Sequence, residues 1–178
     1  MATRDTTRIR RIRPEDWDAL RILRLAALET DPLAFGSNLR REQESDPQKW
    51  KNWATRGSTG AREAIYVAEN EPGQLVGMIG SFTEDEQPHV WGMWVHPKSR
   101  GKGTGGRMLD QLLSWLASAA PARTVLLEVN PSQEAASALY AGRGFVRTGR
   151  TRPLGHSPPA IVEEMARKPA VPRQSREP

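Results

Sequence analysis

The residues best suited to chemistry form one glycine-rich turn. It is made of Arg100, Gly101, Lys102, Gly103, Thr104, Gly105, Gly106 and Arg107. Glycines let successive backbone N–H groups converge on phosphate oxygens, because no Cβ blocks the approach. An amphipathic helix pattern begins directly after the turn, and a helix N-terminus adds partial positive charge at the same place. The turn therefore predicts a phosphate-binding site, with the basic side chains supplying full charges.

Two familiar phosphate motifs compete for this turn. A nucleoside-triphosphate loop needs Gly-Lys followed by Ser or Thr, but Gly103 follows Lys102. A dinucleotide fingerprint fits better, since Gly101, Gly103 and Gly106 satisfy G-x-G-x-x-G and Glu128 stands where a ribose-binding acid belongs. Against it, the segment HPKSR separates the preceding strand pattern from the glycines. The fingerprint also expects repeated strand–helix units, which the remaining chain lacks.

Composition narrows the class of protein. The chain has 178 residues, of which 37% are hydrophobic and 26% charged, as in a globular domain. It contains no cysteine, which excludes disulfides and thiolate chemistry, and its three histidines lack metal-site spacing, so no metal is expected. The N-terminus does not resemble a signal peptide and no run suits a membrane span, so we expect a cytoplasmic location and no membrane partner.

The chain is basic, with a net charge of +5. Basic proteins often bind polyanions such as nucleic acids. Here the arginines are spread along the chain and part of the excess lies in the last residues, without a basic stripe on one helix. A nucleic-acid partner is therefore not expected.

Hydrophobic periodicity gives the order of elements. Alternating or continuous apolar runs predict strands at 7–13, 64–69, 75–82, 89–95, 124–129, 145–151 and 160–166. Helical spacing predicts helices from Pro14 to before Pro32, around 47–54, from 104 to about 120, and from about Asn130 to Gly142 or Gly144. Asn130 or Ser132 would cap the last of these, with Gln133 in a capping box. An acidic loop, TEDEQP, is expected before residue 89.

These elements predict an α/β (α+β) fold. A mixed, mostly antiparallel sheet of about seven strands carries flanking helices, and an antiparallel meander precedes one strand–helix–strand crossover. We expect a single domain over residues 1–168. The tail, 169–178, is rich in proline and charge and is expected to be disordered.

Two segments together resemble the GNAT superfamily of N-acetyltransferases. Residues 100–105, RGKGTG, match its [QR]-x-x-G-x-[GA] signature, and ALYAGRGF at 138–145 resembles its L-Y-x-x-x-G-F segment, with Tyr140 as the tyrosine. Both motifs lie on the matching elements, and the order of elements agrees over about residues 7 to 167. The resemblance implies a GNAT-like fold with acetyl-CoA as cofactor and acetyl donor.

The resemblance also implies where the cofactor lies. The strand near Met93, Trp94 and Val95 would pair with the pantetheine arm, and the glycine turn from Arg100 to Gly106 would hold the pyrophosphate. The following helix would add contacts from Gln133, Ala136 and Tyr140. The family often has asparagine at the position of Gln133, so this chain departs from the pattern there.

The implied reaction is direct attack of an amine on the thioester. Tyr140 is the candidate general acid for the leaving thiolate, and a backbone N–H near Val95 is the expected oxyanion donor. Glu128 is the candidate general base, with Glu84, His89 or a water chain as alternatives. The same residues also allow a second hypothesis, a non-catalytic acyl-CoA sensor or interaction module.

The acceptor is an amine whose identity the sequence leaves open. The acidic residues 84–86 could attract a cationic amine, or could simply be solvated. Trp50, Trp53, Trp91 and Trp94 could line a pocket, although tryptophans are more often packing residues. Residues 34–42 and His156 lie in the loops expected around the acceptor. Dimers are common in the family, so a homodimer is an open alternative.

Overall fold

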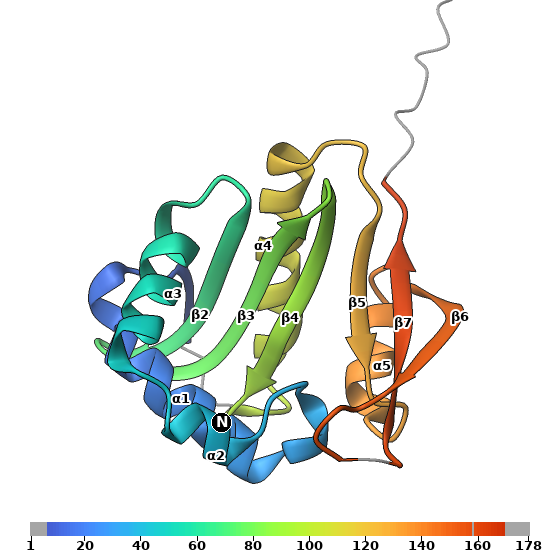
Figure 1. Cartoon of the computed structure of the whole chain (residues 1–178). Coiled ribbons are helices and arrows are strands. Elements are labelled where there is room, and N and C mark those ends of the chain that lie inside the picture. Colours follow the sequence, from blue (N-terminus) through green and yellow to red (C-terminus); the bar gives the residue numbers. More distant parts are fainter. Residues whose placement is uncertain (1–6, 158, 170–178) are drawn as a thin grey trace, which may run out of the picture.

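A computed structural model describes residues 7–157 and 159–169. Within these ranges seven strands form one sheet in the order β1-β2-β3-β4-β5-β7-β6, which confirms the predicted mixed sheet (Figure 1). The strands are β1 (Arg8–Arg11), β2 (Glu63–Glu71), β3 (Gln74–Glu84), β4 (Gln87–Val95), β5 (Val125–Val129), β6 (Val146–Pro153) and β7 (Ile161–Arg167).

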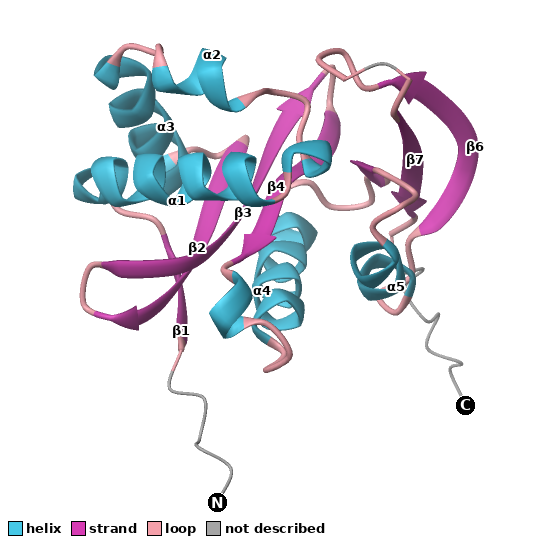
Figure 2. Ribbon diagram, turned by 90° about the horizontal axis from the view of Figure 1, so that it is seen from below, coloured by secondary structure: helices cyan, strands magenta, loops and turns pink. Residues whose placement is uncertain are grey.

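Five α-helices accompany the sheet in the described residues. They are α1 (Trp17–Thr30), α2 (Leu39–Gln43), α3 (Pro47–Thr59), α4 (Thr104–Ala119) and α5 (Glu134–Ala141). Figure 2 shows α1, α2 and α3 on one face of the sheet and α4 and α5 on the other. Each face has its own apolar core, and α4 supplies most of the helical side chains of the second core, with Met108, Leu109 and Leu112 fully buried.

The central feature of the sheet is the parting of β4 from β5. All other neighbouring strands pair antiparallel, but β4 and β5 run parallel and are paired at His89 with Leu126 and at Val90 with Leu127. Beyond Val90 the two strands diverge, so the sheet opens like a wedge between them (Figure 1). A strand edge left in this way presents backbone N–H and C=O groups to whatever fills the gap.

A bulge in β4 lies next to the parting. Gly80 of β3 faces Trp91 and Met78 faces Trp94, so one residue of β3 stands opposite two of β4. Gly92, one of these two, has a φ of 67°, a left-handed conformation that favours glycine. The bulge directs the second half of β4 away from β5.

The acidic loop expected at residues 83–88 is a tight turn. β3 runs to Glu84 and β4 starts at Gln87, with Asp85 and Glu86 at φ values of 45° and 62°. Two consecutive left-handed residues form the turn that fits the twist of a hairpin. The strands are therefore longer than the apolar runs alone predicted.

Two local expectations were wrong. The predicted loop before Pro47 contains the short helix α2, which Asn38 caps by accepting from the Arg41 backbone N–H at 3.0 Å. At the start of α5, Asn130 does not cap the helix; its Oδ1 accepts from the backbone and hydroxyl of Ser132. Gln133 is the residue before the helix and makes no capping bond.

Other boundaries shift by a few residues: the strand predicted at 7–13 covers Arg8–Arg11, and the helix predicted around 47–54 extends to Thr59. α1 ends at Thr30, before Pro32, and α4 covers residues 104 to 119 as the helical spacing predicted. No described helix has the length and apolarity to cross a membrane. Residues 170–178 of the predicted tail lie outside the described residues.

Candidate functional site

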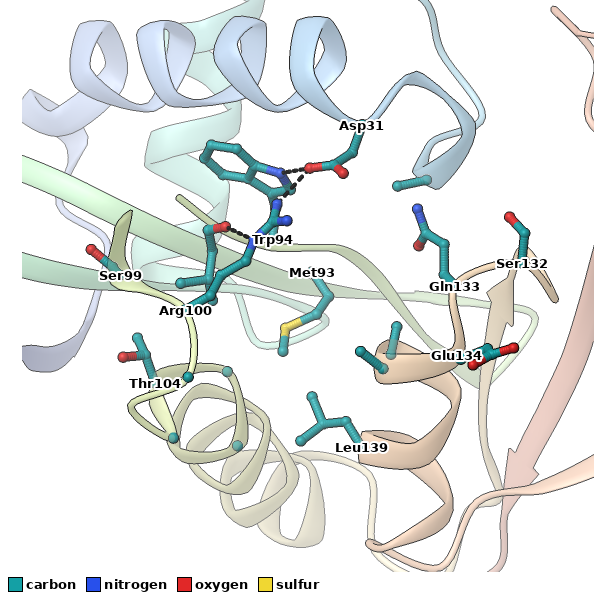
Figure 3. A pocket seen from close by; sticks show the side chains of 18 residues that line it. Asp31, Met93, Trp94, Ser99, Arg100, Thr104, Ser132, Gln133, Glu134 and Leu139 are labelled. Atoms are coloured by element: carbon teal, nitrogen blue, oxygen red, sulfur yellow. Dashed lines mark hydrogen bonds and ion pairs between the residues drawn. The ribbon is translucent and has the colours of Figure 1, made fainter. Parts of the chain in front are cut away.

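A cleft of about 680 Å³ lies between the end of β4 and the start of α5, on the side where β4 parts from β5 (Figure 3). Its walls come from the end of β4, the glycine turn with the first residues of α4, α5, and the segment after α1. The lining residues are Asp31, Ala34, Met93, Trp94, Val95, Ser99, Arg100, Gly101, Gly103, Thr104, Gly105, Gly106, Ser132, Gln133, Glu134, Ala135, Ala136 and Leu139. One elongated molecule of cofactor size fits such a volume.

The glycine turn forms one end of the cleft. Gly101 and Gly103 both have φ values of 76°, and a Cβ built on either would meet no described atom within 4 Å, so the space above them is open. The first backbone N–H of α4 that donates to a carbonyl of the helix is that of Arg107, which bonds to the Gly103 carbonyl at 3.0 Å. The amides of Thr104, Gly105 and Gly106 therefore have no acceptor within the helix.

Thr104 contributes a hydroxyl group to the glycine-turn end of the cleft. Its side chain is buried, lines the cleft, and its Oγ1 has no hydrogen-bond partner among the described residues. A buried hydroxyl without a partner is costly unless a ligand or water supplies one. The open glycines, the amides at the start of α4 and Thr104 together fit a phosphate group.

The edge of β4 forms the long wall. The backbone N–H of His96 donates to the Val76 carbonyl of β3 at 2.8 Å. Because backbone groups alternate sides along a strand, the N–H and C=O of Val95 face away from β3, toward the cleft. The N–H expected to act as the oxyanion donor thus faces the cleft. The Val95 carbonyl already accepts from Arg100 Nε at 2.8 Å.

Arg100 is held away from the phosphate end. Its Nη2 donates to Asp31 Oδ2 at 2.5 Å, and the same carboxylate oxygen accepts from Trp94 Nε1 at 2.6 Å (Figure 3). The guanidinium carbon also lies 5.8 Å from the Trp94 ring centre. The side chain of Arg100 therefore joins the end of α1 to β4.

The other two basic residues of the turn are also directed elsewhere. Lys102 is exposed and is not one of the residues that line the cleft. Arg107 Nη1 donates to the Thr7 carbonyl at 2.9 Å, beside β1. The phosphate end of the cleft is thus built from backbone dipoles and a hydroxyl rather than from full charges.

Tyr140 lies in the core below the cleft. Its side chain is 6% exposed and packs edge-to-face on Phe145, with ring centres 6.0 Å apart. Its neighbours on α5, Ala136 and Leu139, line the cleft, but Tyr140 is not among the lining residues. Burial raises the pKa of the Tyr140 phenol well above its usual value, so the phenol stays protonated at neutral pH.

Glu128 is engaged in an ion pair. Both of its carboxylate oxygens accept from Arg152 of β6, Oε1 at 2.6 Å from Nε and Oε2 from Nη2. The bond to Glu128 raises the pKa of Arg152. Glu128 is not among the residues that line the cleft, and its carboxylate is directed toward Arg152 of β6.

The alternative bases and the tryptophans lie outside the cleft, apart from Trp94. His89 stacks on Phe82 at 5.1 Å, and Glu84 ends β3. Trp50 is fully buried in the core, while the rings of Trp53 and Trp91 lie 5.1 Å apart. These tryptophans serve mainly as packing.

His156 connects two distant loops. Its Nε2 lies 3.2 Å from the Pro32 carbonyl, in the segment that follows α1. The loop between β6 and β7 therefore reaches the segment that follows α1. No group of three or more His, Asp or Glu side chains within the described ranges is placed to hold a metal ion.

Eleven of the thirteen residues predicted to bind the cofactor line this single cleft; Lys102 and Tyr140 do not. Seven lining residues were not among the predicted cofactor contacts: Asp31, Ala34, Ser99, Ser132, Glu134, Ala135 and Leu139. Of these, Ala34 belongs to the loop, 34–42, that was expected around the acceptor. Four of these adjoin α5 residues already proposed, so the helical pattern could have found them. Asp31 could not be found in this way, because it is 63 residues from Trp94 and 69 from Arg100.

Two neighbouring strands that diverge, with a glycine-rich phosphate-binding turn at one end of the gap, are typical of a class of α/β proteins that bind nucleotide cofactors. The model of the Acetyltransferase (GNAT) family matches residues 19–145, and the chain belongs to this family.

Two named acetyltransferases are among the proteins that share sequence with the chain. The N-alpha-acetyltransferase RimI of Mycobacterium tuberculosis is 36% identical over 91 residues, covering 49% of this chain and 55% of the relative. The L-2,4-diaminobutyric acid acetyltransferase of Oceanobacillus iheyensis is 33% identical over 85 residues, covering 46% of each. The chain thus matches about half the length of these relatives.

Solved structures share the fold. A GNAT-family acetyltransferase from Streptococcus pneumoniae superposes with a TM-score of 0.78 at 18% identity, covering 92% of this chain and 99% of that one. The PaiA N-acetyltransferase of Thermoplasma acidophilum, solved in complex with coenzyme A, gives a TM-score of 0.70 at 16% identity with the same coverage. At such identities the likeness establishes the fold.

Proposed function

We propose that this protein is an acetyl-CoA-dependent N-acetyltransferase that acts on a primary amine of a small molecule or peptide. The observation that carries the proposal is the cleft, in which an open strand edge leads to a glycine turn where the Thr104 hydroxyl has no partner among the described residues. Family membership and the names of both relatives, each an acetyltransferase of an amine, support it. The bound cofactor would supply the acetyl thioester.

The proposed contacts follow from the cleft. Gly101, Gly103 and the amides at the start of α4 would bind the pyrophosphate, with Thr104 Oγ1 as a further donor. The edge of β4 at Met93–Val95 would pair with the pantetheine arm, opposite Gln133 and Ala136. Arg100 would have to release the Val95 carbonyl before a ligand could use that acceptor.

The proposed chemistry replaces a C–S bond by a C–N bond. A primary ammonium loses two protons on becoming an amide. A base takes the first before the attack, and the second, lost from the tetrahedral intermediate, balances the proton that the leaving thiolate gains. Tyr140 would give the proton or a hydrogen bond to the sulfur, which its protonated state permits. Glu128 would take the ammonium proton after its bond with Arg152 opens. The Val95 N–H would stabilise the oxyanion.

A direct experiment tests the proposal. The protein is incubated with acetyl-CoA and a broad panel of amines, and free CoA is measured by its thiol. CoA binding is measured separately by calorimetry. Thiol release that depends on the amine supports the proposal. Tight CoA binding without release across the panel would instead support the sensor.

One observation favours that alternative, an acyl-CoA sensor or interaction module. Neither Tyr140 nor Glu128 is among the residues that line the cleft, and Glu128 is neutralised by Arg152. A binding module needs the cleft but neither residue. In that case neither Glu128→Gln nor Tyr140→Phe would change CoA binding, and the wild type would show no turnover for either variant to reduce.

Cellular location and assembly complete the proposal. We expect a cytoplasmic protein, where acetyl-CoA is abundant. A homodimer stays a prediction, which sedimentation of the purified protein would test.

A further inference from the structure

The carboxylate of Asp31 lies on the wall of the cleft, at the end of α1 (Figure 3). Its side chain is 27% exposed, so a molecule in the cleft can reach it. One oxygen, Oδ2, accepts from the Trp94 indole at 2.6 Å and from Arg100 at 2.5 Å. The other oxygen, Oδ1, accepts no hydrogen bond from any residue that the structure describes. The carboxylate is therefore oriented by two donors and keeps one unused acceptor.

Asp31 stands close to the backbone expected to hold the thioester oxygen. Arg100 bonds to Asp31 through Nη2 and to the Val95 carbonyl through Nε, at 2.8 Å, so a single guanidinium separates the carboxylate from Val95. The Val95 N–H is the proposed oxyanion donor. Because the carbon that bears the oxyanion also bears the attacking nitrogen, that nitrogen would lie near Asp31.

The segment that follows Asp31 belongs to the loops expected around the acceptor. The carbonyl of Pro32 lies 3.2 Å from His156 Nε2, so the chain meets the β6–β7 loop directly after Asp31. Ala34 of the same segment also lines the cleft. Asp31 thus lies between the open edge of β4 and these loops, where donor and acceptor would meet.

Glu134 is the other carboxylate among the residues that line the cleft. It is an exposed residue of the first turn of α5, and no described residue forms a hydrogen bond with its side chain. Figure 3 shows it on the α5 wall, across the cleft from Asp31. A proton acceptor must be held at the reacting atoms, which favours the carboxylate that two donors orient.

We infer that Asp31 is a catalytic residue: its Oδ1 accepts a hydrogen bond from the acceptor nitrogen and takes the second of the two protons that the ammonium loses. This inference rests on the proposed function and adds a residue to its mechanism. A carboxylate suits the second proton. The nitrogen of the tetrahedral intermediate is bonded to a carbon that carries oxygen and sulfur, so its N–H is more acidic than that of the parent ammonium.

The step balances as follows. The nitrogen lone pair forms the C–N bond, and the carbonyl pair moves to the oxygen beside the Val95 N–H. Asp31 takes a proton from the nitrogen, the oxygen pair re-forms the carbonyl, and the C–S pair leaves with the sulfur, which gains a proton from Tyr140. Asp31 then gives its proton to water, and Tyr140 regains one from water.

The first test is the single-turnover rate, with the protein in excess over acetyl-CoA and an amine of the panel as acceptor. Release of CoA does not enter this rate. In Asp31→Asn the amide oxygen would take the bond from Trp94, so the NH2 group, a donor, replaces Oδ1. The rate should fall about tenfold or more, as for the loss of a general base. An unchanged rate would overturn the inference while the acetyltransferase function stands.

Glu29→Gln is the matched control, because it removes the same charge from an exposed position of α1. It should keep the wild-type rate. Absence of turnover in the wild type itself would refute the proposed function, which distinguishes that failure from a failure of Asp31 alone.

Chemical rescue separates proton transfer from support of the cleft wall. Asp31→Ala leaves room for a small anion beside Trp94 and Arg100. Formate and nitrate are both planar anions that can accept from these two residues, but formate is the far stronger base. We expect formate to raise the single-turnover rate of Asp31→Ala several-fold and nitrate to leave it unchanged. Equal rates with the two anions would overturn the catalytic role.

A binding measurement tests the Oδ1 contact without turnover. CoA carries no acetyl group, so the protein saturated with CoA binds the amine without reaction. Calorimetry should show the amine binding about tenfold more weakly to Asp31→Asn than to the wild type, because a charge-assisted hydrogen bond is lost. Equal affinities would overturn the contact. A tenfold difference in a protein that shows no turnover would support the contact and refute the proposed function alone.

Discussion

The Asp31 carboxylate holds the Arg100 guanidinium at 2.5 Å and thereby turns the first residue of the glycine signature away from the phosphate end of the cleft. The same oxygen accepts from the Trp94 indole. A cleft proposed for an anionic cofactor thus has a carboxylate on its wall, and the nearest arginine is neutralised by it.

The first prediction concerns this pair. Asp31→Asn removes one negative charge and releases Arg100, so the affinity for CoA should rise about fivefold, corresponding to roughly 1 kcal/mol. Calorimetric titration with CoA measures the change. The double variant with Arg100→Gln should lose the gain, because it depends on the released guanidinium. A weaker affinity in Asp31→Asn would instead make the pair a scaffold for the cleft wall.

The second prediction concerns backbone conformation in the turn. Gly103→Val places a β-branched residue at a φ of 76° and a side chain on the cleft wall, so CoA affinity should be lost. Gly73→Val is the matched control: Gly73 has a φ of 80°, equally open surroundings and a position in the β2–β3 turn. Both variants should lose roughly 1–2 kcal/mol of unfolding free energy. Equal CoA affinity in the two would refute the placement of the pyrophosphate.

The third prediction concerns the phenol of Tyr140. Tyr140→Phe should lower kcat about tenfold or more, as expected for loss of a proton donor, with CoA affinity unchanged. Steady-state kinetics and calorimetry separate the two effects. Tyr66→Phe changes another buried tyrosine of the same core and should leave kcat unaltered. An unchanged kcat in Tyr140→Phe would remove the general-acid role.

The fourth prediction concerns stability in acid. Hydrogen bonds from Arg10, at 2.9 Å, lower the pKa of Glu69 from 4.5 to about 2. The unfolded chain binds the proton first as pH falls, so the stability contributed by Glu69 is complete above about pH 4.5 and is lost down to pH 2.

Glu69→Gln should therefore lose less unfolding free energy than the wild type between pH 5 and pH 2, as measured by urea denaturation. Glu71→Gln, at the exposed end of the same strand, should follow the wild type. If the unfolding free energy of Glu69→Gln fell with pH as steeply as that of the wild type, other carboxylates, such as Asp16, would dominate the acid transition.

The sequence could predict those parts of the fold that depend on local patterns. The meander, the crossover and α4 follow from period-two and period-3.6 spacing, and the structure confirms them. The five-residue helix α2 is too short and polar to produce a periodic signal, although Asn38 provides its cap. The capping box at Gln133 was wrong because Asn130 bonds to Ser132 instead.

The part of the cleft formed by the glycine turn could be predicted from the glycines and from the order of the motifs. Contacts between side chains that are distant in the sequence could not. The destination of Arg100 depends on Asp31, and that of Glu128 on Arg152, 24 residues further along the chain. The direction of a long charged side chain is decided by tertiary neighbours rather than by its own position in a motif.

The parting of β4 from β5 has a consequence for the order of events in a catalytic cycle. The two halves of the sheet are joined there by two residue pairs, so we expect the angle between them to depend on what fills the wedge (Figure 1). A molecule that lies along β4 and touches α5 would fix that angle and the loops at its far end. We therefore expect an ordered sequence, in which the acceptor associates productively only after the donor, and in which the donor leaves last as a spent thiol.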